Sequence, residues 1–543
     1  MNPMITSEAD LPEGALLTSE RGVFALSPAL REGLALISVG KSKQKECWLV
    51  ATEAMFGKPA FLELMENVRK SYEGADESKK YRITRRSKID EQVLKLVYEH
   101  DQIMHSNISE TRDDSKIINY FDEMVADALR EEVSDIHIEK RGHSAIVKMR
   151  KHGEIMEYRE LSKSHAYDLC SVIYNVLAEN RDIVFNDMEY QAAAINRVVE
   201  GIEVKLRYQS LPVYPDGFDV VLRVLPIGKN EEYVPLEKLG YAPSHISELM
   251  DIVSKPVGTL VIAGTTGSGK STTLKNLLMY VHEQRGFKDK IYTVEDPPEY
   301  KIPRVSQIPV IRRKDADYSK KSPFEDPIAA CMRADPDILM IGEVRDRATG
   351  DLLKKAVQSG HQVLTTVHAA SALAIVERFI DFGMSESVLG SQEFISGLCY
   401  QKLVPLICPK CSIDLQESVK SSDSKDIVLL ERIMRVCDLT KDSIRIRGKG
   451  CATCGGIGVI GRTVCAEIIT PDFELLKSFR SGDSIAASIH WRKKSDKDPY
   501  SWNMTGKSAM EHAMLKMRKG MVSPRDVESA FGLITPQALG MDS

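Results

Sequence analysis

The sequence predicts an α/β protein whose main domain is a parallel sheet covered by helices on both faces. Four apolar runs of strand length lie between residues 259 and 367, in the order "TLVIAG", "KIYTV", "DILMIG" and "QVLTTV". Segments with helical periodicity separate these runs, and a glycine-rich turn follows the first of them. Buried parallel strands read as short, continuous apolar runs joined by helices, which is the pattern seen here.

Length and charge set the outer limits of this prediction. The chain has 543 residues, of which 43% are hydrophobic, so it is long enough for three or more domains with real cores. The 73 basic and 78 acidic residues nearly balance, for a formal net charge of −5. Dedicated nucleic-acid binders usually carry a strongly basic domain, so we expect no direct nucleic-acid contact.

The sequence carries no pattern of export or of membrane insertion. Its first ten residues, "MNPMITSEAD", lack a basic segment followed by an apolar stretch, and no window approaches eighteen consecutive apolar residues. Ten cysteines in a chain of 543 residues do not form a disulfide scaffold. We therefore expect a cytoplasmic protein, which can still bind to a membrane protein.

Residues 1–112 are predicted to form an N-terminal domain and a charged linker. Short apolar runs in residues 1–69 indicate a small α/β domain, whereas residues 70–88 hold ten charges in nineteen residues and no apolar period. Such a segment is typical of a solvated linker. Helix-like stretches follow at 91–104 and 115–130.

Residues 113–230 are predicted to form a second, smaller α/β domain, because "DIHIEK", "SAIVKMR" and "FDVVLRVLP" have the composition of half-buried strands. A polar connection leads to the main domain, residues 231–543. Near its end, "VSPRDVESAF" predicts a helix with Ser523 as N-cap and Pro524 at the first helical position.

The glycine-rich turn after the first strand is predicted to bind a nucleoside triphosphate. It fits the pattern GxxxxGK followed by Ser or Thr, with a strand before it and a helix after it. Lys270 should reach the β- and γ-phosphates and Ser271 should hold Mg²⁺. A chance glycine-rich turn is the alternative, and the flanking strand and helix argue against it. The residues predicted to bind ATP are Gly264, Thr265, Thr266, Gly267, Ser268, Gly269, Lys270, Ser271 and Thr272.

Two acidic clusters follow later strands and should lie at the same edge of the sheet. They are "VEDPPEY", with Glu295, and "DILMIGEVRD", with Glu343. The second motif of many NTPases ends its apolar run in Asp, whereas Gly342 takes that place here. We expect Glu343 to orient the attacking water, with Glu295 as the second choice. The alternative for either residue is a surface carboxylate or a helix cap.

Two histidines, His361 and His368, flank the strand in "SGHQVLTTVHAA". Each of them alone is more simply explained as a packing or surface residue. Both together bracket a strand end in the same sheet, where a histidine could sense the γ-phosphate. We therefore include His368 among the candidate catalytic residues.

Two cysteine pairs, "CPKC" at 408–411 and "CATC" at 451–454, are predicted to bind Zn²⁺. Two such turns can supply the four thiolates of a closed, structural zinc site, within an insert at about 400–468. The 39 residues between the pairs exceed the spacing of a short zinc ribbon. Buried or redox-active thiols are the alternative. The predicted ligands are Cys408, Cys411, Cys451 and Cys454.

Taken in order, "GTTGSGKSTTL", "VEDPPEY", "RADPDILMIGEVRD" and "SGHQVLTTVHA" resemble the phosphate loop, Asp box, second NTPase motif and His box of the secretion ATPases. These motors drive type II secretion and type IV pilus assembly. "VSDIHIEK" and "RYQSLPVYPDGFDVVLRVL" look like the family's middle-domain signatures. The cysteine pairs and "IGVIGRTVCAEII" match the metal-binding insert of its assembly and secretion branch. The resemblance spans about residues 115–530.

The resemblance implies a RecA-like P-loop ATPase domain preceded by a PAS-like α/β domain. It implies a homohexamer in which Arg207 and Arg223 of one middle domain complete the neighbour's nucleotide site. The partners it implies are a polytopic inner-membrane platform protein and the pilus or secretion apparatus, on the inner face of the cytoplasmic membrane. His152 and Phe218 depart from the family pattern, as does Ala329 near Arg333. The first 110 or so residues do not look like the family's common N-terminal domain.

The leading hypothesis is an ATPase motor that assembles a type IV-like pilus or extends a type II secretion pseudopilus. One alternative is a DNA-uptake or conjugation ATPase of the same fold, which the near-neutral charge disfavours. Another is a non-catalytic scaffold that binds nucleotide only to hold a ring together, which Lys270 and the two acidic clusters disfavour.

Overall fold

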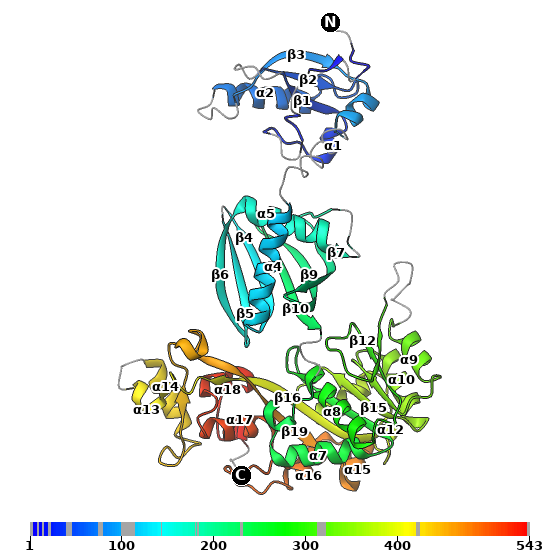
Figure 1. Ribbon diagram of the computed structural model, residues 1–543, viewed down its shortest axis with the longest axis vertical. Coiled ribbons are helices and arrows are strands. Elements are labelled where there is room, and N and C mark those ends of the chain that lie inside the picture. The colour runs from blue at the N-terminus through cyan, green and yellow to red at the C-terminus, as the bar shows by residue number, and fades with distance from the viewer. Residues whose placement is uncertain are drawn as a thin grey trace. The chain divides into compact units, whose positions relative to one another are not determined.

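Figure 1 shows the computed structural model. The chain divides into two compact units, Met1–Tyr120 and Phe121–Ser543. The residues it describes are all except 1–3, 8–9, 13–15, 20–22, 40–45, 74–79, 99–113, 143, 180, 182–183, 228–231, 312–321, 420–423 and 540–543. None of the helices among these described residues has the length and apolar character needed to cross a bilayer.

The N-terminal unit is a small α/β domain built on a three-stranded sheet in the order β1-β2-β3. Its elements are α1 (Pro28–Arg31), β1 (Leu34–Ser38), β2 (Glu46–Ala51), α2 (Pro59–Glu73) and β3 (Arg82–Lys88). Strands β1 and β2 pair antiparallel, whereas β3 pairs parallel to β2 after the crossover through α2. The two faces of the sheet carry separate apolar clusters.

The prediction of a solvated linker over residues 70–88 is wrong where the structure describes it. Helix α2 continues to Glu73, and β3 occupies 82–88. In β3, exposed Arg82 alternates with half-buried Ile83 and Arg85, and the guanidinium of Arg85 lies 4.2 Å from the centroid of the Trp48 ring. The alternation of a strand is therefore present, but long basic side chains occupy several of its positions. The high density of charge alone was therefore not evidence of a linker. Of the helix predicted at 91–104, residues 91–98 are helical and the rest lies outside the described residues.

The middle domain is a seven-stranded antiparallel sheet in the order β6-β5-β4-β10-β9-β8-β7. Helix α4 (Asp114–Arg130) crosses this sheet, because its Asp122 binds Arg197 of β8 and its Asp127 accepts from the Tyr158 hydroxyl of β6. The three strands predicted from sequence are confirmed as β4, β5 and β10. The bounds are β4 (Val133–Arg141), β5 (Ser144–Lys151), β6 (Glu154–Ser162), α5 (Lys163–Val172), the π-helix η4 (Ile173–Leu177), β7 (Ala178–Glu179), β8 (Gln191–Val199), β9 (Ile202–Val213) and β10 (Gly217–Ile227).

The main domain contains the predicted parallel sheet, in the order β13-β12-β14-β15-β11-β16-β19, with only β19 antiparallel. The four apolar runs are confirmed as β11, β12, β14 and β15, neighbours in this sheet. Alternate residues of β11 face two different cores: Leu260 packs with α7 and α8, and Val261 packs with α10 and α11. The strands are β11 (Gly258–Ala263), β12 (Ile291–Glu295), β13 (Ser306–Pro309), β14 (Ile338–Ile341), β15 (Gln362–Val367), β16 (Ile395–Ile407) and β19 (Val459–Ile469).

Helices cover both faces of this sheet and form the C-terminal region. Those beside the sheet are α6 (Leu236–Leu239), α7 (Pro243–Ser254), α8 (Lys270–Gln284), α9 (Glu325–Cys331), α10 (Arg347–Gln358), α11 (Ala374–Asp381) and α12 (Glu386–Leu389). The later ones are α15 (Phe473–Ser481), α16 (Ser484–Arg492), α17 (Ala509–Arg518), α18 (Pro524–Phe531) and η6 (Gln537–Leu539). Helix α18 confirms the prediction made from Ser523 and Pro524.

Between β16 and β19 the chain forms a small lobe that contains the two-stranded antiparallel sheet β17-β18. Its elements are β17 (Ile413–Asp414), α13 (Leu415–Val419), α14 (Ser424–Ile433), β18 (Arg445–Ile446) and η5 (Ala452–Cys454). Strands β16 and β19 pair with each other from Leu398 to Ile407 and belong to the main sheet. The lobe is therefore connected to the main sheet through the end of β16 and the start of β19.

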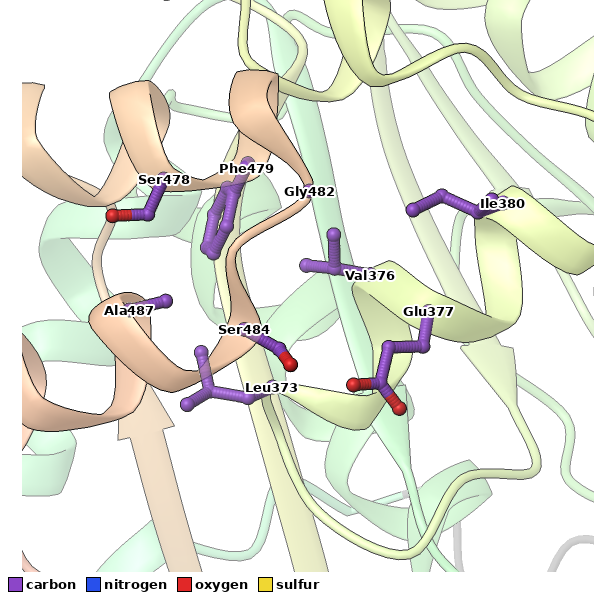
Figure 2. Close-up of a pocket in the computed structure, with 9 residues that line it drawn as sticks. All are labelled: Leu373, Val376, Glu377, Ile380, Ser478, Phe479, Gly482, Ser484 and Ala487. Carbon is purple, nitrogen blue, oxygen red and sulfur yellow. The ribbon is translucent and has the colours of Figure 1, made fainter.

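A small apolar pocket lies between α11 and the helices α15 and α16 (Figure 2). Leu373 and Val376 face Phe479 and Ala487 across it. Its volume of about 20 Å³ suffices for roughly one water molecule, so it is a packing defect and not a substrate site.

A pair of buried histidines joins α7 to α17. The rings of His245 and His512 have centroids 4.9 Å apart, and both side chains are buried. His512 Nδ1 accepts from the Ala466 amide at 3.1 Å, whereas both nitrogens of His245 and Nε2 of His512 have no partner among the described residues. Burial lowers the pKa of His245 to about 3 and that of His512 well below its usual value, and the charge of Lys516 adds to both shifts.

These two histidines should make the main domain sensitive to acid. Each is neutral in the folded state and ionises near pH 6.5 when unfolded, so its contribution to stability is complete above pH 6.5 and is lost as the pH falls. For His245, whose pKa is about 3, the loss should reach roughly 2 kcal/mol at pH 5. Acidification from pH 7 to pH 5 should therefore lower the melting temperature of the His245→Phe variant less than that of the parent.

The measurement is thermal unfolding of parent and variant at both pH values. His361→Phe serves as the control because His361 is only half-buried, at the end of α10. An equal acid shift in the parent and in His245→Phe would contradict the assignment.

Candidate nucleotide-binding and metal sites

The phosphate loop connects β11 to α8 and uses its glycines as the sequence predicts. Gly264, Gly267 and Gly269 have φ values of +153°, +77° and +85°, a region that favours glycine. A Cβ on Gly264 would lie 2.5 Å from the carbonyl oxygen of Gln401. The Gln401 side chain donates to the Ser268 carbonyl at 2.7 Å. Strand β16 thus holds the loop against the N-terminus of α8, where anions bind favourably.

Lys270 is the first residue of α8. Its Nζ donates to the carbonyl oxygens of Gly264 at 2.8 Å and Thr265 at 3.1 Å. Burial lowers the pKa of Lys270, and the carboxylates of Glu343 and Glu299 act against that shift. The lysine and these two acids therefore share one electrostatic environment at the carboxyl edge of the sheet.

Glu343 emerges from β14 directly after Gly342. The Gly342 amide donates to the Val294 carbonyl of β12 at 2.8 Å, and its carbonyl accepts from Thr366 Oγ1 of β15 at 2.6 Å. A Cβ at Gly342 would lie 3.0 Å from the Val294 oxygen. The close approach of the strands favours glycine at the position where other NTPases have Asp, and the acid follows one residue later.

The Glu343 carboxylate lies beside two further side chains. His368 Nε2 is 3.2 Å from Oε1, and Arg345 Nε is 3.6 Å from Oε2. His368 follows β15, so neighbouring strands bring the two predicted residues together. His361 lies at the other end of β15, where its Nδ1 contacts the Ser359 hydroxyl at 2.9 Å.

Glu295, the second predicted acid, is engaged within the sheet. Its Oε1 accepts from Thr293 Oγ1 at 2.6 Å and from Gln307 Nε2 at 3.0 Å. Burial raises the pKa of Glu295. One of its oxygens is thus already committed to two hydrogen bonds.

The two predicted arginines are cross-strand partners in the middle domain. Arg207 of β9 lies opposite Arg223 of β10. Arg223 Nε pairs with Asp135 Oδ1 at 3.0 Å, and Arg207 Nη2 donates to the Asp296 carbonyl of the main domain at 3.0 Å. Burial lowers the pKa of Arg207, and the charge of Arg223 lowers it further, whereas Glu299 and Asp296 oppose the shift.

Two residues in the quoted motifs were not selected as site residues. Glu299 acts on both Lys270 and Arg207, and Arg345 lies between the two acidic clusters. Their place within "VEDPPEY" and "GEVRD" was the available signal.

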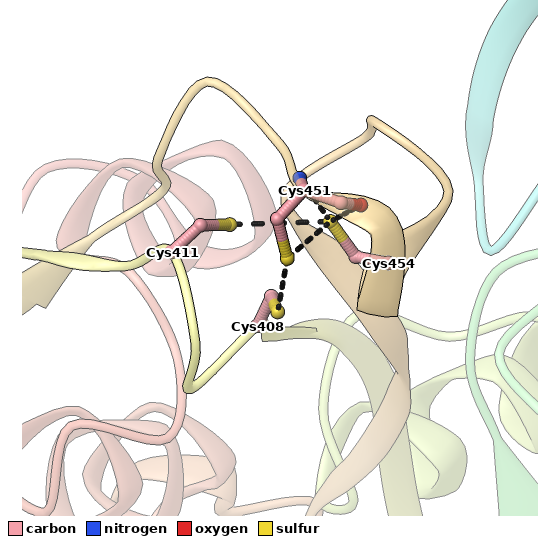
Figure 3. Close-up of side chains that lie close together, drawn as sticks. All are labelled: Cys408, Cys411, Cys451 and Cys454. Carbon is pink, nitrogen blue, oxygen red and sulfur yellow. Dashed lines mark hydrogen bonds between the residues drawn. The ribbon is translucent and has the colours of Figure 1, made fainter.

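The four predicted cysteines meet at one point in the lobe (Figure 3). Their sulfur atoms all lie within 4.8 Å of one another, with separations of 3.7 Å for Cys408–Cys451, 3.8 Å for Cys451–Cys454 and 3.9 Å for Cys411–Cys454. Zn–S bonds of about 2.3 Å in a tetrahedron place sulfurs about 3.8 Å apart, so the four thiols fit Zn²⁺. All four are free cysteines, which argues against disulfides.

Backbone amides also favour thiolates at this point. The amides of Cys451 and Gly458 donate to Cys454 Sγ at 3.1 and 3.2 Å, and the hydrogen bond from Cys451 is the main reason that the pKa of Cys454 falls to about 6. Such N–H donors to sulfur support metal ligands.

A model of the type II/IV secretion system protein family matches residues 110–519. The chain belongs to this family. Type II secretion system protein E of Pseudomonas aeruginosa is 30% identical over 428 residues, which are 79% of this chain and 78% of that protein. Type IV pilus assembly ATPase PilB of Thermus thermophilus is 30% identical over 378 residues, which are 68% of this chain and 39% of that protein.

A solved structure of another ATPase, DotB of Legionella pneumophila, has a similar fold. It matches with a TM-score of 0.52 at 20% sequence identity, covering 76% of this chain and 94% of that one. Membership of the secretion system protein family and this fold agree with the phosphate loop and the acidic motifs described above.

The purified protein should contain about one zinc per chain, because four thiolates complete a tetrahedral site. Cys408→Ser should lower the zinc content at least several-fold and reduce the melting temperature of the main domain. Zinc is measured by elemental analysis after gel filtration without chelator. Cys399→Ser is the control, since Cys399 lies in β16, in the core of the main sheet. Full zinc content in Cys408→Ser would rule out this ligand set.

Proposed function

We propose that this protein is the ATPase motor of a type IV pilus assembly system or a type II secretion system. The observation that carries the proposal is the position of Glu343, beside His368 and in the electrostatic environment of Lys270. The names of the relatives support the same assignment: a type II secretion system protein E and a pilus assembly ATPase.

The chemistry assigned to each residue follows from this arrangement. The loop from Gly264 to Thr272 grips the triphosphate, and Lys270 leaves its carbonyl partners to reach the β- and γ-phosphates. Mg²⁺, held by Ser271, supplies charge neutralisation for the phosphates. Glu343 orients the attacking water, because Glu295 is already engaged by Thr293 and Gln307. His368 holds the Glu343 carboxylate in place.

In this proposal the chain has three domains. Residues 1–112 dock on the apparatus, residues 113–230 form a domain of PAS-like architecture, and residues 231–543 form a RecA-like ATPase domain. Six chains form a ring in which Arg207 and Arg223 approach the nucleotide of the neighbouring subunit. Closure of the site moves the middle domain, and a polytopic platform protein of the inner membrane receives the movement. The protein then acts at the cytoplasmic face of that membrane.

Lys270→Ala and Glu343→Ala should each lower ATP turnover about 100-fold or more, because phosphate stabilisation and water activation each contribute at least that much. Lys270→Ala should also weaken nucleotide binding, whereas Glu343→Ala should retain it. Turnover, nucleotide affinity and pilus formation or secretion are measured in parallel. Lys355→Ala and Glu377→Ala, both on exposed helix positions, are the matched controls. Undiminished turnover in both site variants would refute this active site.

The ring arrangement has its own test by subunit mixing. If Arg207 acts on a neighbour, Lys270→Ala chains and Arg207→Ala chains are inactive alone, but mixed rings contain some complete sites. We expect mixing to restore a fraction of the parent's turnover. Arg207 also contacts Asp296 of its own chain, so mixtures that stay inactive would assign the arginine to its own subunit instead.

A further inference from the structure

Arg345 connects the two acidic clusters of the nucleotide site. Its Nη2 lies 3.6 Å from Asp296 Oδ2, and its Nε lies 3.6 Å from Glu343 Oε2. The guanidinium carbon is 5.0 Å from the centroid of the buried Phe324 ring. Two carboxylates and an aromatic face therefore fix the plane of one side chain.

We propose that Arg345 is a positioning residue for ATP hydrolysis, holding Glu343 and Asp296 in fixed relation without touching the nucleotide. This inference rests on the proposed function, in which Glu343 orients the attacking water.

Charge explains why the site requires such a residue. Glu343, Asp296 and Glu299 gather at the edge where a triphosphate brings several further negative charges. Like charges within a few ångströms repel, most strongly where water is partly excluded. The Glu343 and Asp296 side chains are only 26% and 18% exposed, so solvent screens them incompletely. A cation between the two acids offsets this repulsion and prevents Glu343 from turning away from the γ-phosphate.

The contact also connects Glu343 to the middle domain. Asp296 accepts from Arg207 through its backbone carbonyl and pairs with Arg345 through its carboxylate. A change in the position of Arg207 therefore acts on the same residue that restrains Arg345. Lysine cannot replace this arrangement fully, because a single ammonium lacks the planar fork that reaches two carboxylates.

Arg345→Gln should lower kcat about 10- to 100-fold, the range for losing the coupling between contacting charged residues, with KM and nucleotide affinity changed less than about threefold. Arg345→Lys should lie between the parent and Arg345→Gln. Arg378→Gln is the matched control, because Arg378 is 44% exposed and pairs with Asp381 at 3.7 Å, against 41% and 3.6 Å for Arg345. Steady-state turnover, nucleotide titration and melting temperature are measured on the full chain.

A double-mutant cycle separates positioning from independent effects. If Arg345 and Asp296 act as one unit, Arg345→Gln combined with Asp296→Asn should have a kcat within about threefold of Arg345→Gln alone. If the two substitutions instead lowered kcat independently, so that the fold-losses of the single variants multiplied in the double variant, the inference would be overturned. A nucleotide affinity that falls as much as kcat would also overturn it, since Arg345 would then bind the nucleotide directly.

Glu343→Gln distinguishes this inference from the proposed function. An active Glu343→Gln variant refutes the role of Glu343 in the proposed function. An inactive Glu343→Gln together with a fully active, normally folded Arg345→Gln refutes only the role of Arg345.

Discussion

The close approach of β12 and β14 at Gly342 is the constraint on which the nucleotide site depends. The Gly342 amide donates to β12, its carbonyl accepts from Thr366 of β15, and the Val344 amide donates to the Thr366 carbonyl at 2.9 Å. The backbone on both sides of Glu343 is therefore fixed by neighbouring strands. Positioning a reacting group in advance removes much of the entropy cost of catalysis. Glycine is the residue that permits this approach, so the acid stands beyond it.

A rigid edge that collects acids needs cations to hold it together. Lys270 of the phosphate loop and Arg345 at the same strand exit supply positive charge beside Glu343, and His368 after the next strand has its Nε2 3.2 Å from Glu343 Oε1. The interactions of Glu343 with Lys270 and His368 join elements that are distant in sequence, whereas Arg345 stands only two residues after Glu343. The charge balance of the site therefore depends on the sheet order, with β14 between β12 and β15, as well as on the motif that contains Glu343 and Arg345.

The parts predicted from sequence are those that a local pattern determines. The four parallel strands, the phosphate loop and the helix after Ser523 each have a signature within about fifteen residues. The cysteine pairs meet although 39 residues separate them, because β16 and β19 pair along their length and bring Cys408 and Cys451 to the same end.

Other features depend on packing between distant segments and left no local signature. The pairing of Arg345 with Asp296 and the buried pair of His245 and His512 belong to this class. The edge strand β3 was missed for a different reason. Its alternation of exposed and half-buried positions includes arginines, and composition alone assigns arginines to solvent.

The contacts of the middle-domain arginines give the proposed coupling of nucleotide to movement a physical basis. Arg207 and Arg223 face each other across neighbouring strands, and like charges in that arrangement are destabilising. Asp135 compensates Arg223 through an ion pair, whereas Arg207 has a neutral backbone carbonyl as its hydrogen-bond acceptor. A phosphate group placed beside Arg207 would relieve the remaining repulsion more strongly than that carbonyl does. In the proposed motor, binding of a triphosphate would therefore favour a middle-domain position in which Arg207 follows the anion, and loss of the γ-phosphate would remove that preference.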